Sequence, residues 1–174
     1  MFEKYSANSP SRRVRMTWKF AFSSPAHIIA SFFGSGVLRP ASGTWGTFAA
    51  WLVYMALRDF VSPVAWVCII FVTFIIGTWA TSISCKDLGV HDHSSVVIDE
   101  VFAIWMVQIA VPYGILWQIA AFIAFRFFDI VKIQPAKWFD ESPRWQNALG
   151  VMLDDLVAAV YSIILLRFII VFVS

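Results

Sequence analysis

The side chains in this sequence best suited to chemistry are carboxylates at the edges of long apolar runs. Asp99 and Glu100 precede one run, Asp129 follows it, and Asp154 and Asp155 precede the last run. Carboxylates beside apolar segments are costly to desolvate, so their concentration there indicates a function. Hard divalent cations bind carboxylate oxygens, and the chain has only three histidines. This composition therefore favours Mg²⁺ or Mn²⁺ over zinc.

Basic residues lie close to these acids. Arg126 and Lys132, with Lys137 further along, provide positive charge for binding phosphate. Carboxylates, a divalent cation and basic side chains together are typical of phosphoryl chemistry. A glycine-rich stretch at 34–47 precedes an apolar run. Its backbone N–H groups can bind an anion where a helix begins.

Structural interpretations remain open for each group. Asp154 or Asp155 can stabilise the start of the last helix, since acids are favoured there. Arg126 and Asp129 have the i, i+3 spacing of a helix ion pair. His91 and His93 flank Asp92, and such a pair either binds metal, transfers a proton or forms a hydrogen-bonded loop.

The composition assigns the chain to the integral membrane class. Of its 174 residues, 60% are apolar and 14% are charged, whereas soluble domains have about 25% charged residues. This excludes a soluble globular domain and a disordered chain. The two cysteines exclude a disulfide framework and a cysteine-rich zinc site. The sequence contains no phosphate-binding G-x-x-x-x-G-K-[ST] loop, which argues against a nucleotide hydrolase.

The first 23 residues are interpreted as a basic cytoplasmic arm. Residues 1–19 contain five bases and one acid, a net charge of +4. Positive charge before the first apolar run places the N-terminus in the cytoplasm. The stretch lacks the apolar core of a signal peptide. Residues 24–174 are then expected to form a single membrane-embedded domain.

The apolar runs predict an all-α membrane protein of about five helices, several of them short or tilted. A short apolar segment at 26–33 is expected to lie at the membrane interface. If the polar stretches 34–47, 86–100 and 126–155 form one site, they must lie on the same side of the membrane. Two helical hairpins satisfy that condition, 48–58 with 63–82 and 100–111 with 114–128. A final helix from 156 to 173 follows.

Four ordered blocks resemble the bacterial phosphatidylglycerophosphatase A family. They span roughly residues 24–165 and contain Gly34–Gly36 with Gly43–Thr47, Lys86–Glu100, Phe125–Asp140 and Gly150–Ala158. The chain departs from the family pattern at some glycine and proline positions. The residues now at those positions include Ser42, Ala103, Ile133, Ala136 and Ala159. The charged positions all remain.

The resemblance implies a Mg²⁺-dependent lipid phosphatase of the bacterial cytoplasmic (inner) membrane. It would convert phosphatidylglycerophosphate to phosphatidylglycerol and phosphate, with its active site on the cytoplasmic side. The expected partners are this phospholipid and the bilayer, and no nucleic acid.

Together, the residues and the resemblance give a mechanistic hypothesis. One or two Mg²⁺ ions would be held by Asp99, Glu100, Asp129, Asp154 and Asp155. Catalysis would involve Asp99, Glu100, Asp129, Asp155 and His93, with either water or an aspartate as the nucleophile. The phosphate would be bound by Arg126, Lys132, Gly43, Thr44 and Lys86.

Three other functions remain open at the level of sequence. An ion-coupled transporter would also place acids beside interrupted apolar runs. A membrane scaffold derived from such an enzyme would retain the fold and lose the activity. A phosphatase for another lipid phosphate, such as phosphatidic acid, would use the same residues.

Overall fold

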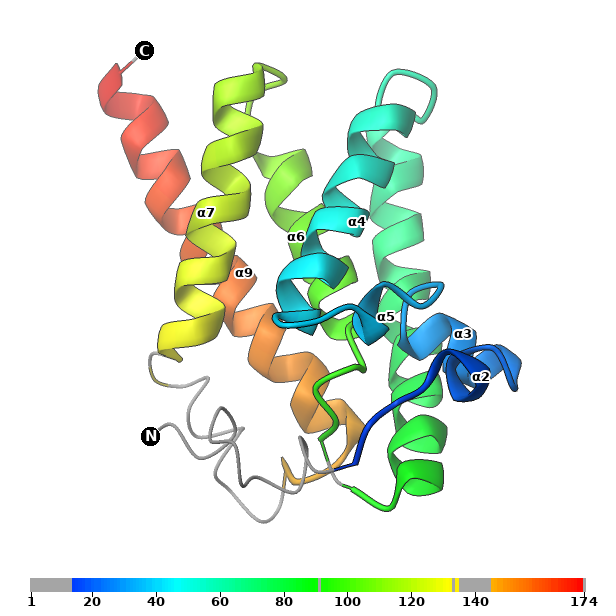
Figure 1. The fold of residues 1–174 in the computed structure, drawn as a ribbon. Coiled ribbons are helices and arrows are strands. Elements are labelled where there is room, and N and C mark those ends of the chain that lie inside the picture. The colour runs from blue at the N-terminus through cyan, green and yellow to red at the C-terminus, as the bar shows by residue number, and fades with distance from the viewer. Residues whose placement is uncertain (1–13, 91, 133, 135–144, 174) are drawn as a thin grey trace.

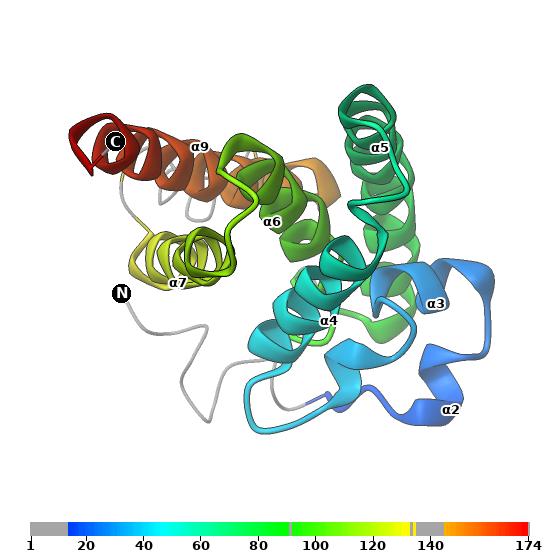
Figure 2. The same cartoon turned by 90° about the horizontal axis from the view of Figure 1, so that it is seen from above.

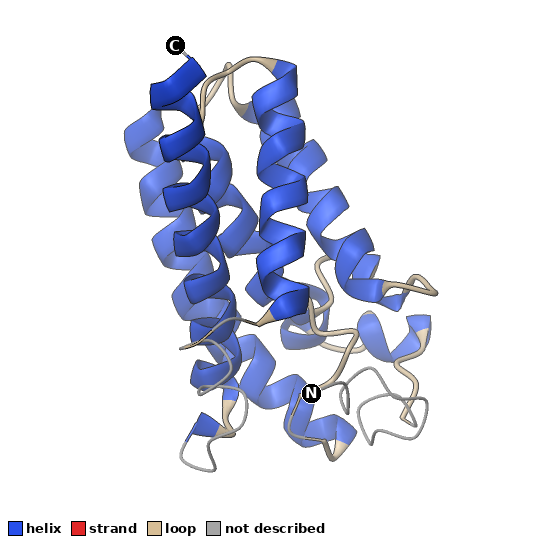
Figure 3. Cartoon of the chain, turned by 90° about the vertical axis from the view of Figure 1, so that its left-hand side faces the viewer, coloured by secondary structure: helices blue, strands red, loops and turns tan. Residues whose placement is uncertain are grey.

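The computed structural model describes residues 14–90, 92–132, 134 and 145–173. These residues form seven α-helices and one 3₁₀ helix, with no strand (Figures 1 and 3). The helices are α2 (Trp18–Ala21), α3 (Pro25–Ala30), the 3₁₀ helix η1 (Ser35–Val37), α4 (Ser42–Leu57), α5 (Pro63–Leu88), α6 (Ile98–Ala110), α7 (Ile115–Val131) and α9 (Ala148–Val173). The all-α prediction is confirmed for this part of the chain. The first 13 residues of the predicted basic arm lie outside it.

The five longer helices correspond to the predicted apolar runs but extend further into the polar stretches. Helix α4 begins at Ser42, so most of the second half of the glycine-rich stretch is helical. Helix α9 begins at Ala148, which places Asp154 and Asp155 within the helix. Helix α5 continues to Leu88 and ends at Gly89, whose φ of +67° suits glycine. The predicted interfacial segment 26–33 overlaps α3, and α2 is a further short helix.

Helix α6 forms the centre of the bundle. Nine of its thirteen residues are buried, and it packs against α4, α5, α7 and α9 (Figure 2). Helix α4 packs mainly on α6, η1 and α7, whereas α5 packs mainly on α3, α6 and α9. A short turn joins α4 to α5 as the predicted hairpin requires, although each of them packs more on α6 than on the other. The Tyr54 ring of α4 contacts the Trp66 ring of α5, with 4.8 Å between the two ring centroids.

Two helices, α5 and α9, are long and apolar enough to cross a membrane. Only 28% and 22% of their most apolar windows are buried inside the protein, so these surfaces are available to lipid. Each has 26 residues, about 39 Å at the helical rise, against about 30 Å of hydrocarbon. Helices α4, α6 and α7 have 16, 13 and 17 residues and are correspondingly shorter.

The polar segments meet at one end of the bundle. The start of α4, the start of α6, the end of α7 and the start of α9 lie toward the lower end in Figure 1. The two interhelical turns and the C-terminus lie at the opposite end. There Arg58 Nη1 donates to the carbonyl of Tyr113 at 2.7 Å and joins the two turns. The arrangement agrees with the predicted placement of the polar stretches on one side.

We expect Gly36→Ala to destabilise the fold, because η1 lies directly against the backbone before α6. A Cβ at Gly36 would collide with the carbonyl of Ser95 and lie 3.0 Å from its carbon. Two backbones must then separate, at a cost of roughly 1–3 kcal/mol in the free energy of unfolding. The measurement is the unfolding midpoint in detergent. Gly114→Ala is the control, since its nearest neighbour is Trp117 Cδ1 at 3.6 Å. Equal midpoints for both variants would contradict the prediction.

Candidate active site

A cavity of about 280 Å³ lies where the polar segments meet. Its walls come from the start of α4 and the loop before it, the segment before α6, the start of α6, the end of α7, and α9. The lining residues are Arg39, Pro40, Ala41, Ser42, Gly43, Thr44, Asp92, His93, Ser94, Val96, Asp99, Glu100, Arg126, Asp129, Ile130 and Asp155. Four of the five predicted metal-binding carboxylates are thus brought together in one cavity.

Arg126 is a buried cation in the wall of this cavity. Its Nη1 donates to Asp129 Oδ2 at 2.7 Å and to Glu100 Oε1 at 3.0 Å. The same nitrogen lies 3.2 Å from Thr47 Oγ1, which is 3.0 Å from Glu100 Oε2. The Arg126 and Glu100 side chains are each only 12% exposed. One buried guanidinium therefore holds carboxylates from α6 and α7 together.

Helix α4 reaches the carboxylates because it begins with small residues. A Cβ at Gly43 would collide with the Glu100 carboxylate in its present position, so glycine lets the two lie this close. No side chain caps the first turn of α4, whose Gly43 and Thr44 line the cavity. Ser42, one of the departures from the family pattern, donates its hydroxyl to the carbonyl of Ser94. The start of α4 is thereby fixed between the segment before α6 and Glu100.

Asp99 and Asp155 join Glu100 and Asp129 in what we call the acidic wall of the cavity, which also holds Arg126. Asp155 is 4% exposed, and its Oδ2 has no hydrogen-bond partner within the described chain. Asp99 is 6% exposed, and its Oδ1 accepts from the Glu100 N–H at 3.0 Å. Among the described residues that line the whole cavity, Arg39 and Asp92 included, five carboxylates stand against two arginines. Such an excess of buried negative charge favours binding of a cation.

The acidic wall fits a hard divalent cation by its donor type. Asp155 presents an unpartnered buried oxygen, and Asp99 and Asp129 line the same cavity. Oxygen donors of this kind are the ligands that Mg²⁺ takes. Across residues 14–173, apart from the gaps at 91, 133 and 135–144, no three acidic, histidine or cysteine residues form a ready-made metal cluster.

Comparison with known proteins identifies the family of this chain. The model of the family described as phosphatidylglycerophosphatase A matches residues 28–170. The chain belongs to the phosphatidylglycerophosphatase A family. The matched segment contains every residue that lines the cavity. The resemblance stated from the sequence and the predicted enzyme class, a phosphatase, are confirmed.

Individual relatives agree with the family match. The chain is 38% identical over 148 residues to "Phosphatidylglycerophosphatase A" of Haemophilus influenzae, covering 84% of this chain and 89% of the relative. It is 35% identical over 152 residues to the protein of that name in Escherichia coli, covering 87% of each. It is 36% identical over 148 residues to a "Putative phosphatidylinositol-3-phosphatase" of Bacteroides thetaiotaomicron, covering 80% and 89%. No solved structure matches the chain.

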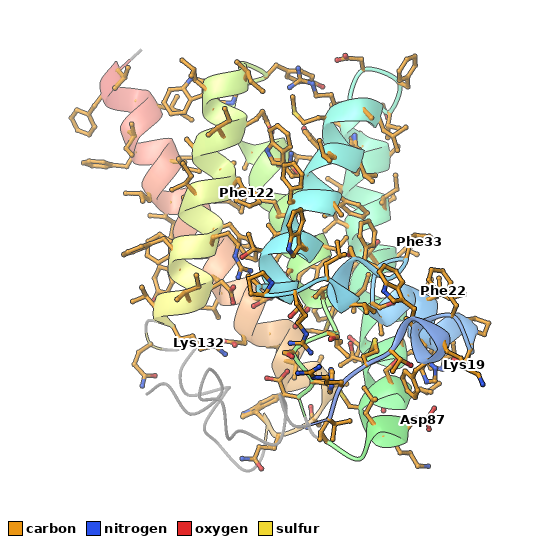
Figure 4. All side chains as sticks on the ribbon, in the orientation of Figure 1. Lys19, Phe22, Phe33, Asp87, Phe122 and Lys132 are labelled. Atoms are coloured by element: carbon orange, nitrogen blue, oxygen red, sulfur yellow. The ribbon has the colours of Figure 1, made fainter. Side chains whose placement is uncertain are left out.

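Three predicted residues of the family site lie outside the cavity. Asp154 pairs with Lys132, which lies at the end of α7 (Figure 4). Consecutive helical residues point about 100° apart, so Asp154 faces α7 while Asp155 faces the cavity. Lys86 is exposed on the last turn of α5 and does not line the cavity. The structure therefore does not bring Asp154, Lys132 and Lys86 to the position predicted for them.

His93 lines the cavity but does not offer a ring nitrogen to it. Its Nδ1 accepts from the Ser95 N–H at 3.0 Å, and its Nε2 lies 2.7 Å from the carbonyl of Val14. These bonds require a neutral ring protonated at Nε2. Both ring nitrogens bond to backbone groups, so this arrangement does not support the predicted catalytic role of His93. His91 and Lys137 lie outside the described residues.

Sequence reasoning missed several residues that line or support the cavity. Arg39, Asp92 and Ser94 line the cavity, and Thr47 bonds to Glu100 and Arg126. Arg39 had a usable signal, because it is the only basic residue in the glycine-rich stretch 34–47. Thr47 lies in the family block Gly43–Thr47, but nothing in the sequence marked it as a partner of Glu100 and Arg126.

We expect Arg126→Gln to lower the free energy of unfolding by roughly 3 kcal/mol, because it leaves Glu100 and Asp129 buried without their cation. The measurement is chemical unfolding in detergent with EDTA, so that no added metal replaces the lost charge. Adding Glu100→Gln to this variant should recover part of the loss. Simple additivity of the two substitutions would contradict the proposed coupling.

Acid should destabilise the wild type more than the His93→Gln variant. Burial, the largest cause, holds the pKa of His93 below its ordinary value of 6.5. Below pH 6.5 the unfolded chain therefore takes up a proton that the folded chain does not, and stability falls toward the lowered pKa. The measurement compares unfolding midpoints at pH 7.5 and 5.5. An equal decrease in both proteins would contradict the prediction.

Proposed function

We propose that this protein hydrolyses the phosphomonoester of phosphatidylglycerophosphate in a Mg²⁺-dependent reaction, yielding phosphatidylglycerol and phosphate. One observation carries the proposal. A cavity lined by buried carboxylates, Arg126 and the uncapped start of α4 lies at the polar end of an apolar bundle. This cavity lies within the family match, which makes a lipid phosphate the substrate class that fits it.

The names of the relatives support the same reaction class. Two are named for phosphatidylglycerophosphate and one, as putative, for phosphatidylinositol 3-phosphate. Each of these lipids carries a phosphomonoester on an alcohol that is joined to diacylglycerol by a phosphodiester. The agreement of the first two names with the family model favours phosphatidylglycerophosphate for this chain.

Asp99, Asp129 and Asp155 would hold Mg²⁺ in the cavity. The bound ion supplies positive charge that stabilises the transferring phosphoryl group. Arg126 orients Asp129 through its hydrogen bond and offsets the charge of Glu100. The first-turn N–H groups at Gly43 and Thr44 would bind phosphoryl oxygens, as uncapped helix starts do. Glu100 acts by holding Arg126 and Thr47 in place.

The placement proposed in the membrane follows from helix length and surface. Helices α5 and α9 would cross the cytoplasmic (inner) membrane with α4, α6 and α7 beside them, and the cavity would face the cytoplasm. The exposed residues of α7 and α9 include Leu116, Ile123 and Phe168, as expected of a lipid-facing surface. A lipid head group would then reach the cavity without leaving the bilayer. The transporter alternative lacks support, because the acids gather at one end with basic partners.

Purified protein in detergent should release phosphate from phosphatidylglycerophosphate with Mg²⁺ and lose that activity with EDTA. Asp155→Asn should reduce the rate about 100-fold or more, because it removes an unpartnered carboxylate oxygen from the cavity. Asp154→Asn is the matched variant, an adjacent and equally conservative change outside the cavity, and should cost much less.

Three results would contradict the proposal. Full activity in EDTA would exclude the metal, and equal losses in the two variants would exclude the assigned roles of Asp154 and Asp155. Release from phosphatidic acid or phosphatidylinositol 3-phosphate but not from phosphatidylglycerophosphate would change the substrate. An acid quench that traps labelled phosphate on the protein would identify an aspartate, rather than water, as nucleophile.

A further inference from the structure

We propose that Arg39 and Ser94 form a second anion subsite, which binds the phosphodiester of the lipid head group. The acidic wall would bind the phosphomonoester. This inference rests on the proposed function, because it concerns how the same cavity holds the rest of that substrate. Phosphatidylglycerophosphate carries two phosphate groups separated by a glycerol. The residues assigned so far account for only one of them.

The start of α4 separates two walls of the cavity. On one side, Gly43 lies against the carboxylate of Glu100, which is bonded to Arg126. On the other side, the adjacent Ser42 donates its hydroxyl to the carbonyl of Ser94. Arg39 Nη1 lies 3.4 Å from Ser94 Oγ, so Arg39 belongs to this second, outer wall. A head group bound across the first turn of α4 would contact both walls.

The two walls carry different sets of charged side chains, and the two phosphates of the lipid carry different charges. The acidic wall has four carboxylates and Arg126, and would bind an anion with the help of a metal. The outer wall has Arg39 and Asp92, and His93 is neutral because both its nitrogens bond to backbone. A phosphodiester carries a single negative charge, which one guanidinium can match through two parallel hydrogen bonds. Asp92 offers an acceptor for the glycerol hydroxyl.

The apolar surface next to Arg39 gives the direction of the lipid. Leu38 precedes Arg39 and lines an apolar groove with Phe33, Val53 and Trp105. Phe33 is 69% exposed on the side of the bundle that carries α2 and α3 (Figure 4). Arg39 thus lies between the acidic wall and the groove. The phosphodiester likewise lies between the phosphomonoester and the acyl chains, so one acyl chain of the same lipid is the occupant that fits the groove.

The test separates the two phosphates by using a partial ligand for each. Phosphatidylglycerol carries the diester without the monoester, and inorganic phosphate resembles the monoester alone. Both are measured as competitive inhibitors of the full-length protein in uncharged detergent micelles. Arg39→Gln should weaken inhibition by phosphatidylglycerol about tenfold and raise KM for the substrate similarly, because a charged hydrogen bond is lost. Inhibition by inorganic phosphate should not change.

Three further variants complete the design. Arg39→Lys keeps the charge and should restore part of the affinity for phosphatidylglycerol. Arg15→Gln is the matched control, an exposed arginine on the N-terminal segment that does not line the cavity. It should leave both inhibition constants unchanged. Arg39 is itself exposed, and Ser94→Ala provides a second way to weaken the subsite if Arg39→Gln fails to fold.

Three outcomes would overturn the inference. Unchanged inhibition by phosphatidylglycerol in Arg39→Gln would exclude the subsite. Equal weakening by both inhibitors would move Arg39 to the phosphomonoester, and the same effect in Arg15→Gln would reduce it to general surface charge. Absence of phosphate release by the wild type would instead contradict the proposed function. Direct binding of phosphatidylglycerol to wild type and Arg39→Gln, measured without turnover, tests the subsite in that case.

Discussion

The hydrogen bonds of Arg126 to Glu100 and Asp129 are the interaction on which the site depends. A guanidinium this deeply buried is stable only with carboxylates in contact, and those carboxylates need it equally. The pairing joins α6 to α7, and Thr47 extends it to α4. Polar contacts therefore join three helices at the end of the bundle that holds the cavity. The positions of Asp99 and Asp155 around the cavity follow from that arrangement.

Small residues make this arrangement possible. Glycines at 36, 43 and 46 occur where another segment lies too close for a Cβ, namely the Ser95 backbone, the Glu100 carboxylate and the Val97 side chain. They bring η1 and α4 against the segment that leads into α6. The glycine-rich stretch thus serves two purposes, because the close approach also exposes the first turn of α4 to the cavity. A bulkier start of α4 would keep its N–H groups away from the carboxylates.

Much of the architecture was predictable from the sequence. Apolar runs located the five longer helices, and the same-side argument placed the polar segments at one end. Four of the five proposed metal-binding carboxylates line one cavity. The remaining differences have physical causes. Asp154 and Asp155 are neighbours of the same residue type. They differ only in the direction each faces from α9, which depends on how α9 packs. The role of His93 depends on a hydrogen bond to Val14, 79 residues away, which no local pattern encodes.

The unequal helix lengths have a consequence for the surrounding lipid. Helices α5 and α9 are about 39 Å long, whereas the shorter helices with exposed apolar residues, α4 and α7, have 16 and 17 residues and are about 25 Å long. In a bilayer, such hydrophobic mismatch is relieved by local thinning beside the shorter helices. The leaflet would then dip toward the cavity, and a phosphate would meet Arg126 below the general level of the lipid head groups. The reaction rate would then depend on bilayer thickness, because local thinning costs more free energy in a thicker membrane.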